Sequence, residues 1–411
     1  MVLGIVVRLA IAPLTGHPYD MALWADYQRI FYGSGILDFK YFPTLPPLYY
    51  AQLAIYSFYT LLRIGGLQDP VLFYHSTYAI EGVFLKLPMI LADMGVFLLF
   101  VRTGRILPAV LYYLNPFMIY LSAAWGTYDS LMIVFLVAGF VALEKGNKPL
   151  ATLAFTVSGL VKLFGFIPLA LIVLDNIARR RFKDISVQFA IVSSSVAMTF
   201  APVILQGGLQ TFFSGFSRFV GISTAQGTGW NIVSALQGTQ FQAVSPFVWI
   251  AYLSIPVFFV LQIRKSSSLL LSVLKASLLG AILLNIFSQA EPQWLSWPIP
   301  IALIYASATK RTGLSYYAYS FGAIATFLVM TLTQGSSYIL FGLLGGAYLA
   351  PLEGFVGALP VYATTTLSLL LLLIGYLYGK PVKFKLEVLA LVMIIYAQAY
   401  FWFSIIGIQN L

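Results

Sequence analysis

Residues 82–101 read GVFLKLPMILADMGVFLLFV, and the turn that follows them contains Arg102 and Arg105. A run of about 20 mostly apolar residues is long enough to cross the roughly 30 Å hydrocarbon core of a bilayer. Basic residues of membrane proteins are concentrated in the cytoplasmic turns. We therefore expect residues 82–101 to form a membrane-spanning helix that ends on the cytoplasmic side.

The composition of the whole chain has the same character. Of 411 residues, 60% are hydrophobic and only 9% are charged, and the mean hydropathy is +0.90. Soluble globular domains carry about 25% charged residues, so this composition excludes a soluble protein. An aromatic content of 16% excludes a disordered chain, and the absence of Cys excludes disulfides and cysteine nucleophiles. The chain is therefore predicted to be an all-α polytopic membrane protein.

About 13 transmembrane helices are predicted from the apolar runs. The segments are 1–14, 82–101, 106–122, 130–143, 149–161, 164–178, 185–205, 246–263, 268–288, 294–309, 314–333, 358–378 and 386–406. With the N-terminus on the cytoplasmic side, 15 of the 23 basic residues fall in cytoplasmic turns. The net charge of +10 is therefore explained by orientation and does not indicate a nucleic-acid partner.

Two long segments fall on the outer side, at 15–81 and 206–245, and eight of the thirteen acidic residues are outside. This distribution places the chemistry on the outer face. Leu48–Leu62 is predicted to be a helix in the outer interface, because a span there would invert the charge pattern downstream. We divide the chain into a catalytic transmembrane module at 1–205 and a C-terminal transmembrane module at 206–411.

The segment that follows the first span contains a carboxylate, an imidazole and an indole, at Asp20, His17 and Trp24. Asp20 is a candidate general base, because an ionised carboxylate needs only hydrogen-bond reach to accept the proton of an attacking hydroxyl. The alternative is that Asp20 caps a helix that starts near Met21. Asp26 lies on a different helical face from Asp20 and is expected to be solvated.

Four basic residues fall inside spans or at their ends. Arg8 lies about 9 Å below the outer end of the first span, and either binds a lipid phosphate or neutralises Asp93 in the second span. Lys162 lies at the tip of a thin hairpin, where it suits an anionic group, with snorkelling as the alternative. Lys86 and Lys275 are expected to snorkel to the nearer interface.

Two outer turns combine aromatic rings with carboxylates. One contains Trp125 and Asp129, and the other contains Glu291 and Trp294. Sugar rings stack on indoles while their hydroxyls bind acids, so these turns suit a sugar. The alternative is an aromatic belt at the membrane interface combined with helix caps.

Taken in order, these segments resemble the GT-C superfamily, the multi-span glycosyltransferases that take a sugar from a polyprenyl-phosphate carrier. The stretches that carry the resemblance are Arg8-Leu9, His17 to Asp26, Tyr41-Phe42-Pro43 through Pro46-Pro47-Leu48-Tyr49, Lys86-Leu87-Pro88 with Asp93, Leu114-Asn115-Pro116, Trp125-Gly126 with Asp129, and Gly159-Leu160-Val161-Lys162. They cover most of the first half of the chain. The ordered set is much more specific than any one of its members.

A narrower similarity is to the GPI mannosyltransferase I catalytic subunit and related prokaryotic mannosyltransferases. It rests on the spacing from Asp20 to Asp26 and on residues 292–297, PQWLSW. That group has an Asp-x-Asp signature in its first outer loop, whereas here Pro18 stands at the first acidic position. No metal site is therefore expected, and a divalent metal cofactor is an alternative that the missing acid disfavours.

The resemblance implies a GT-C-like fold and an activity. A hexose, with mannose chosen by analogy, would move from a polyprenyl-phosphate carrier to a hydroxyl of a glycan or glycolipid acceptor, with inversion, on the outer face of a prokaryotic cell membrane. Asp20 would be the catalytic base. The predicted substrate-binding residues are Arg8, His17, Trp24, Trp125, Asp129, Lys162, Arg218, Glu291 and Trp294.

Two alternatives remain open. A transporter or flippase for lipids or lipid-linked sugars would fit the span count and the buried charges at Arg8, Asp93 and Lys275. The ionisable residues crowd one face without a repeated half, which favours the enzyme. A non-catalytic GT-C-like subunit would also explain the missing first acid.

Overall fold

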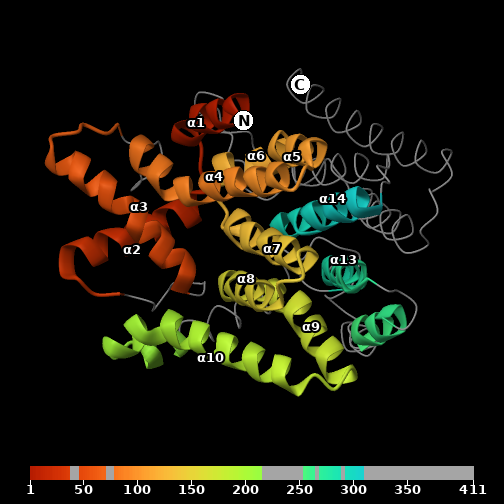
Figure 1. Ribbon diagram of the computed structural model, residues 1–411. Helices are drawn as coiled ribbons and strands as arrows, with labels where there is room; N and C mark the ends of the chain where they lie inside the picture. The colour runs from red at the N-terminus through yellow and green to blue at the C-terminus, as the bar shows by residue number, and fades with distance from the viewer. Residues whose placement is uncertain (38–45, 71–77, 215–252, 264–267, 288–291, 310–411) are drawn as a thin grey trace, which may run out of the picture. The chain divides into compact units, whose positions relative to one another are not determined.

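The computed structural model describes residues 1–37, 46–70, 78–214, 253–263, 268–287 and 292–309 (Figure 1). These residues form helices and turns and contain no β-strand, which confirms the all-α prediction for this part of the chain. Described residues from 1 to 214, except Asn115–Phe117, belong to one compact unit. Those from 253 to 309 belong to a second unit, together with Asn115–Phe117. The predicted module boundary after residue 205 stays a prediction.

The described part of the chain contains α-helices and short 3-10 and π-helical turns. In chain order they are α1 (Val2–Ile11), η1 (Ala12–Leu14), α2 (Pro18–Ser34), α3 (Pro46–Ile64), α4 (Ala79–Arg102), α5 (Ile106–Tyr113), α6 (Pro116–Ile119), η2 (Tyr120–Trp125), α7 (Asp129–Glu144), α8 (Lys148–Val161), η3 (Leu163–Gly165), α9 (Phe166–Ala178), α10 (Phe182–Leu205), Leu253–Ile263, α13 (Leu269–Phe287), η4 (Pro292–Ser296) and α14 (Pro298–Thr309). Each apolar run predicted between residues 1 and 205 is therefore helical.

Two described helices, α4 and α10, are long and apolar enough to cross a membrane. The segments Ile106–Tyr113 and Pro116–Trp125 would count as a third span if taken together, but they bend by 53° at the break between them. The other apolar helices, such as α8 and α9, are shorter than a full span. The predicted number of 13 spans is thus not confirmed, and the last three predicted spans lie outside the described residues.

Helix α4 forms much of the core of the first unit. It packs against α3, α5 and α7, and α7 in turn packs along α8. Its sequence is apolar on nearly all sides, and Leu85, Met89, Ile90, Val96 and Phe100 are completely buried. A helix that is apolar all round is typical of one surrounded by other helices or by lipid. This explains why the stretch at 82–101 determines so much of the fold.

The predicted interfacial helix is present as α3, although its position relative to a membrane stays a prediction. It buries Tyr49 and Tyr56 on one face, whereas Phe58 and Ile64 are exposed on the other. A polar network joins α2 and α3 to the amino end of α4. The Arg29 guanidinium and the Tyr56 hydroxyl both donate to the buried carboxylate of Glu81, the former at 3.0 Å through Nε. The network holds α2 in place beside the core.

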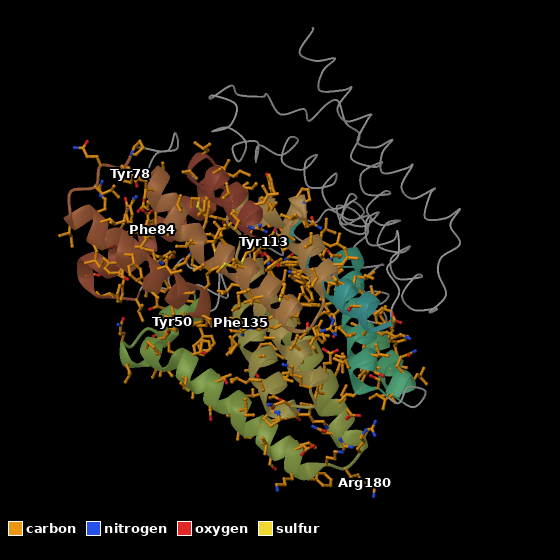
Figure 2. The ribbon with its side chains drawn as sticks, turned by 45° about the horizontal axis from the view of Figure 1, so that its top comes forward. Tyr50, Tyr78, Phe84, Tyr113, Phe135 and Arg180 are labelled. Atoms are coloured by element: carbon orange, nitrogen blue, oxygen red, sulfur yellow. The ribbon has the colours of Figure 1, made fainter. Side chains whose placement is uncertain are left out.

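Two of the basic turns that were predicted to be cytoplasmic, at 145–148 and 179–183, lie at one end of the first unit. Lys148, at the start of α8, donates to Asn176 at 2.9 Å and lies 3.6 Å from Asp184, at the start of α10. Figure 2 shows Arg180 at this end, far from Tyr78 and Phe84 at the other. The two turns therefore share one side, as the charge-based topology requires.

Candidate functional site

The helix that contains Asp20 begins earlier than the sequence indicated. Pro18 is its first residue, and a proline favours the first turn because its missing N–H is not needed there. His17 is the N-cap, and its Nδ1 accepts a hydrogen bond from the Asp20 amide at 3.4 Å. The alternative interpretation of Asp20 as the N-cap is therefore wrong. Its carboxylate lies in the first turn and is available for other contacts.

The Asp20 carboxylate faces a tryptophan from a distant part of the chain. Trp125 donates its indole N–H to Asp20 Oδ2 at 2.7 Å, and His17 Nδ1 lies 3.3 Å from the same oxygen. The imidazole of His17 stacks on the indole of Trp125, with ring centroids 4.9 Å apart and planes inclined by 17°. The Asp20 side chain keeps 25% of its surface exposed. It is therefore oriented by side chains and still accessible.

His17 Nδ1 has two functions that exclude each other. As a lone-pair acceptor it caps the Asp20 amide, and as a protonated donor it binds the Asp20 carboxylate. Whether Nδ1 carries a proton decides between them, and a neutral imidazole can carry its proton on either ring nitrogen. His17 is therefore placed to control how Asp20 is held rather than to bind a substrate alone.

Trp125 is positioned by an irregular turn. Residues Tyr120–Trp125 form the π-helical turn η2, and such turns frequently occur at functional sites. Gly126 ends the turn in the left-handed region at φ 90°, where its amide and that of Thr127 both donate to the Leu121 carbonyl at 2.9 Å. A Cβ at Gly126 would lie 2.8 Å from Met21 Cε and 2.9 Å from Lys86 Cγ. Both the backbone conformation and the close approach therefore require glycine.

We expect Gly126→Ala to destabilise the protein more than a matched glycine substitution. Gly146 also has a left-handed backbone, at φ 73°, but a Cβ there would meet no atom within 4 Å. Gly146→Ala should cost about 1–2 kcal/mol from the backbone alone, and Gly126→Ala about 1–3 kcal/mol more from overpacking. Thermal unfolding in detergent measures both. Equal stability of the two variants would contradict the close packing of Gly126.

Lys162 lies at the hairpin tip between α8 and η3, where the sequence placed it. Its ammonium is 3.0 Å from Asp129 Oδ1 and 4.8 Å from the centre of the Tyr128 ring, and its side chain is 11% exposed. Asp129 begins α7 and is completely buried. The sequence indicated no acidic neighbour for Lys162 and assigned Asp129 to sugar hydroxyls. The structure instead pairs the two residues.

Electrostatics connect the hairpin tip with the first outer loop. Burial by itself would raise the pKa of Asp20, but the charge on His17, hydrogen bonds from His17 and Trp125 and the charge on Lys162 outweigh it. The pKa of Asp20 therefore lies below its ordinary value of 3.8. The carboxylate is ionised at neutral pH. Lys162 is also close enough to act on it electrostatically.

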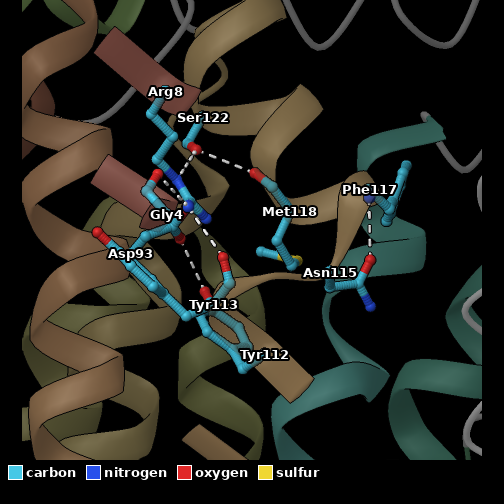
Figure 3. A network of polar contacts seen from close by, with 9 residues as sticks. All are labelled: Gly4, Arg8, Asp93, Tyr112, Tyr113, Asn115, Phe117, Met118 and Ser122. Atoms are coloured by element: carbon cyan, nitrogen blue, oxygen red, sulfur yellow. Dashed lines mark hydrogen bonds and ion pairs between the residues drawn. The ribbon is translucent and has the colours of Figure 1, made fainter. Parts of the chain in front are cut away.

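Arg8 takes the second of its two predicted roles. Its Nη2 and Nε lie 2.8 and 3.1 Å from Asp93 Oδ2, and its Nη1 donates to the carbonyls of Gly4 and Tyr113 (Figure 3). Ser122 accepts a further bond from Nε, and neither Arg8 nor Asp93 is exposed. The guanidinium thus makes its hydrogen bonds and its ion pair with groups of the protein core. The prediction that Arg8 binds a substrate phosphate is not supported by this arrangement.

Two residues of α2 differ in their exposure. Trp24, which was predicted to stack on a sugar, is 1% exposed and packs in the core with Tyr128 edge-on to its ring, so its faces are covered. Asp26 is 60% exposed and lies 3.7 Å from Arg29. The expectation of a solvated Asp26 is confirmed, and Trp24 is a packing residue.

The remaining predicted site residues lie outside the first unit or outside the description. Trp294 is part of η4 in the second unit and stacks on Trp297 with ring centroids 4.7 Å apart. Arg218 and Glu291 lie outside the described residues. Their predicted substrate contacts stay predictions.

The sequence identified several residues of the site but not the side chains that they contact. Trp125 is 105 positions from Asp20, and Lys162 is 33 positions from Asp129, so no local pattern could pair them. The contact between His17 and Trp125 was equally invisible. Within the described ranges, no three His, Cys, Asp or Glu side chains gather as metal ligands. The metal alternative stays untested.

Comparisons with known proteins give a distant likeness. The chain matches no protein-family profile and no curated protein. It is similar in structure to ArnT from Cupriavidus metallidurans bound to undecaprenyl phosphate, with a TM-score of 0.47 and 15% identity, over 99% of this chain and 76% of ArnT. The apo state of ArnT gives a TM-score of 0.46 and 14% identity over 98% and 76%. At this distance, what ArnT binds says nothing about the ligand of this chain.

Proposed function

We propose that the chain is an inverting membrane glycosyltransferase of the GT-C type. It moves a hexose, with mannose as our choice, from a polyprenyl-phosphate carrier to an acceptor hydroxyl on the outer face. The observation that carries the proposal is the state of Asp20. Its carboxylate caps no helix, is oriented by Trp125 and His17, and is partly exposed. A carboxylate that only stabilises the core is normally buried and hydrogen-bonded to protein donors, with no surface left for a substrate.

Asp20 is the general base in this proposal. It accepts the proton of the acceptor hydroxyl while that oxygen forms a bond to the anomeric carbon of the donor sugar. The bond from the anomeric carbon to the phosphate oxygen breaks on the opposite face, so the configuration inverts. The low pKa of Asp20 keeps the carboxylate ionised before the reaction. The proton ends on Asp20 and the electron pair on the phosphate.

The leaving group is a phosphate monoester that is stable as an anion, so it needs a cation and no general acid. We assign Lys162 to this role, because its charge acts on Asp20 and its side chain is 11% exposed. Asp129 orients the ammonium through the 3.0 Å contact. Arg218 is proposed to approach the phosphate from the outer loop, and Glu291 and Trp294 to contact the sugar.

Trp125 has a different role from the one the sequence predicted. One face of its indole is covered by the His17 ring, and its N–H is directed at Asp20. We therefore assign it to holding the base, and leave sugar stacking to Trp294. The choice of mannose and of a glycan or glycolipid acceptor rests on the sequence resemblance alone.

The transporter alternative loses part of its support. It required Arg8 and Asp93 to line a polar path, but these residues bind each other in the core and neither is exposed. A non-catalytic subunit remains the rival, because it would keep the same fold.

Reconstitution into vesicles separates the three cases. The vesicles contain polyprenyl-phosphate mannose and an acceptor glycan, and the medium contains no energy source. Transfer of sugar to the acceptor supports the enzyme, and repeating the assay with a chelator tests the metal alternative. Movement of the carrier across the bilayer without transfer supports the transporter. Carrier binding with neither result supports the non-catalytic subunit.

We expect Trp125→Phe to move the acidic limb of the pH–rate profile to higher pH. Trp125 donates to the ionised form of Asp20, so its removal raises the pKa of that carboxyl group. The base is active only when ionised, and activity is lost as the pH falls through its pKa. The rate measured from pH 3 to 8 checks this, with Asp26→Asn as a control that should not move the limb. A limb unchanged in Trp125→Phe would contradict the role of the indole.

A further inference from the structure

Lys86 lies in α4 and differs from its predicted state. It was expected to snorkel to the nearer interface, but its side chain is completely buried. Its ammonium donates to the Ala12 carbonyl at 2.8 Å and to the Thr15 carbonyl, and it lies 3.5 Å from Thr15 Oγ1. Among the described residues, no carboxylate forms an ion pair with it. The side-chain nitrogen of Lys86 is thus held by loop oxygens.

These oxygens lie on the short stretch between α1 and α2. Ala12 begins η1, and Thr15 directly follows its last residue. An ammonium group has three donors and can bind several such oxygens at once. Thr15 Oγ1 itself lies 2.9 Å from the Ile11 carbonyl and 3.4 Å from the Ala123 carbonyl. The segment is therefore fixed to α4 on one side and to η2 on the other.

The stem of Lys86 contacts the second segment of the site. A Cβ at Gly126 would lie 2.9 Å from Lys86 Cγ and 3.4 Å from Lys86 Cε, so the glycine backbone packs directly on the stem. Thr15 is two residues before His17, and Gly126 directly follows Trp125. One buried side chain thus contacts both segments that hold Asp20.

We propose that Lys86 is a positioning residue that sets the contact between Asp20 and Trp125. The inference rests on the proposed role of Asp20 as base. Lys86 touches no reacting atom. Its hydrogen bonds locate the start of α2, and its stem locates the end of η2. Without the ammonium, the carbonyls of Ala12 and Thr15 lose their donor, and His17 and Asp20 move relative to the indole.

The test is Lys86→Met, which keeps the length of the stem and removes the ammonium. A displacement of about 1 Å can lower a rate by on the order of 10²-fold, so kcat should fall by about that factor while KM for the donor stays the same. The acidic limb of the pH–rate profile should move to higher pH, as in Trp125→Phe. Lys148→Met is the matched control: it removes a partly buried lysine at the other end of the unit and should change neither quantity.

A second readout does not depend on activity. The protein is labelled with 5-fluorotryptophan, and Trp125→Phe identifies the fluorine resonance of Trp125. In the unmodified chain this resonance should shift as Asp20 titrates, and in Lys86→Met the shift should be lost. If Lys86→Met does not fold, Thr15→Val removes the side-chain oxygen beside the ammonium and should weaken the same shift.

An unchanged Trp125 titration in the folded variant overturns the inference, whatever the activity. A lost titration in a chain without transfer activity would instead support the positioning by Lys86 and reject the proposed function. The two failures are therefore distinguishable.

Discussion

Asp20→Asn should lower kcat by about 10²- to 10⁴-fold, the usual contribution of a general base. The amide oxygen of Asn can still accept the Trp125 indole N–H, so the local geometry should be preserved. The amide cannot accept the proton of the acceptor hydroxyl. The rate is measured with radiolabelled donor in vesicles, and the donor Kd is measured separately and should change little.

Asp26→Asn is the matched control, because it makes the same chemical change on the same helix. Asp26 is 60% exposed and contacts only Arg29 among the interactions described, so its loss should leave kcat unchanged. Similar losses in both variants would indicate a general effect of charge on α2. Full activity in Asp20→Asn would reject the base assignment while leaving the fold intact.

Arg8→Met should destabilise the protein by about 3–5 kcal/mol, the cost of breaking a buried ion pair from one side. The substitution leaves Asp93 buried with only the Tyr112 hydroxyl, at 2.9 Å, among its described hydrogen bonds. The substitution also removes the donors of the Gly4 and Tyr113 carbonyls (Figure 3). Thermal and denaturant unfolding in detergent measure the loss.

The double variant Arg8→Met/Asp93→Leu should recover most of this stability, because apolar replacement of a whole buried pair is often neutral. Lys183→Met removes an exposed positive charge and should change the stability by no more than about 0.5 kcal/mol. An Arg8→Met variant as stable as the unmodified chain would mean that Arg8 is not part of the core. Restored stability without activity would show that the pair also shapes the site.

The candidate site was partly predictable. His17, Asp20, Trp125 and Lys162 were all selected from the sequence, because charged residues are few in an apolar chain and the imidazole and the indole each stand close to an acid in the sequence. Their roles were less predictable. Trp24 has the same side chain as Trp125, yet it is buried in the core, since exposure depends on which helices cover it.

The burial of Lys86 was harder to predict, because its contacts among the described residues include no carboxylate. A lysine near the end of a span snorkels by default, and its acceptors here are main-chain carbonyls that every residue has. No sequence pattern marks which carbonyl groups will lie within reach of a buried lysine. The same holds for Asp129, whose pairing with Lys162 depends on the return of the chain through α8.

The sequence by itself determined the helical, lipid-compatible class, the approximate positions of the apolar helices between residues 1 and 205, and the shared side of the basic turns at 145–148 and 179–183. These properties follow from hydrophobicity and charge summed over neighbouring residues. Only the tertiary structure decided which charges neutralise each other and which carboxylate stays accessible. Arg8 joins Asp93 and Asp20 joins Trp125 across 85 and 105 positions, and contacts at that separation depend on how helices pack.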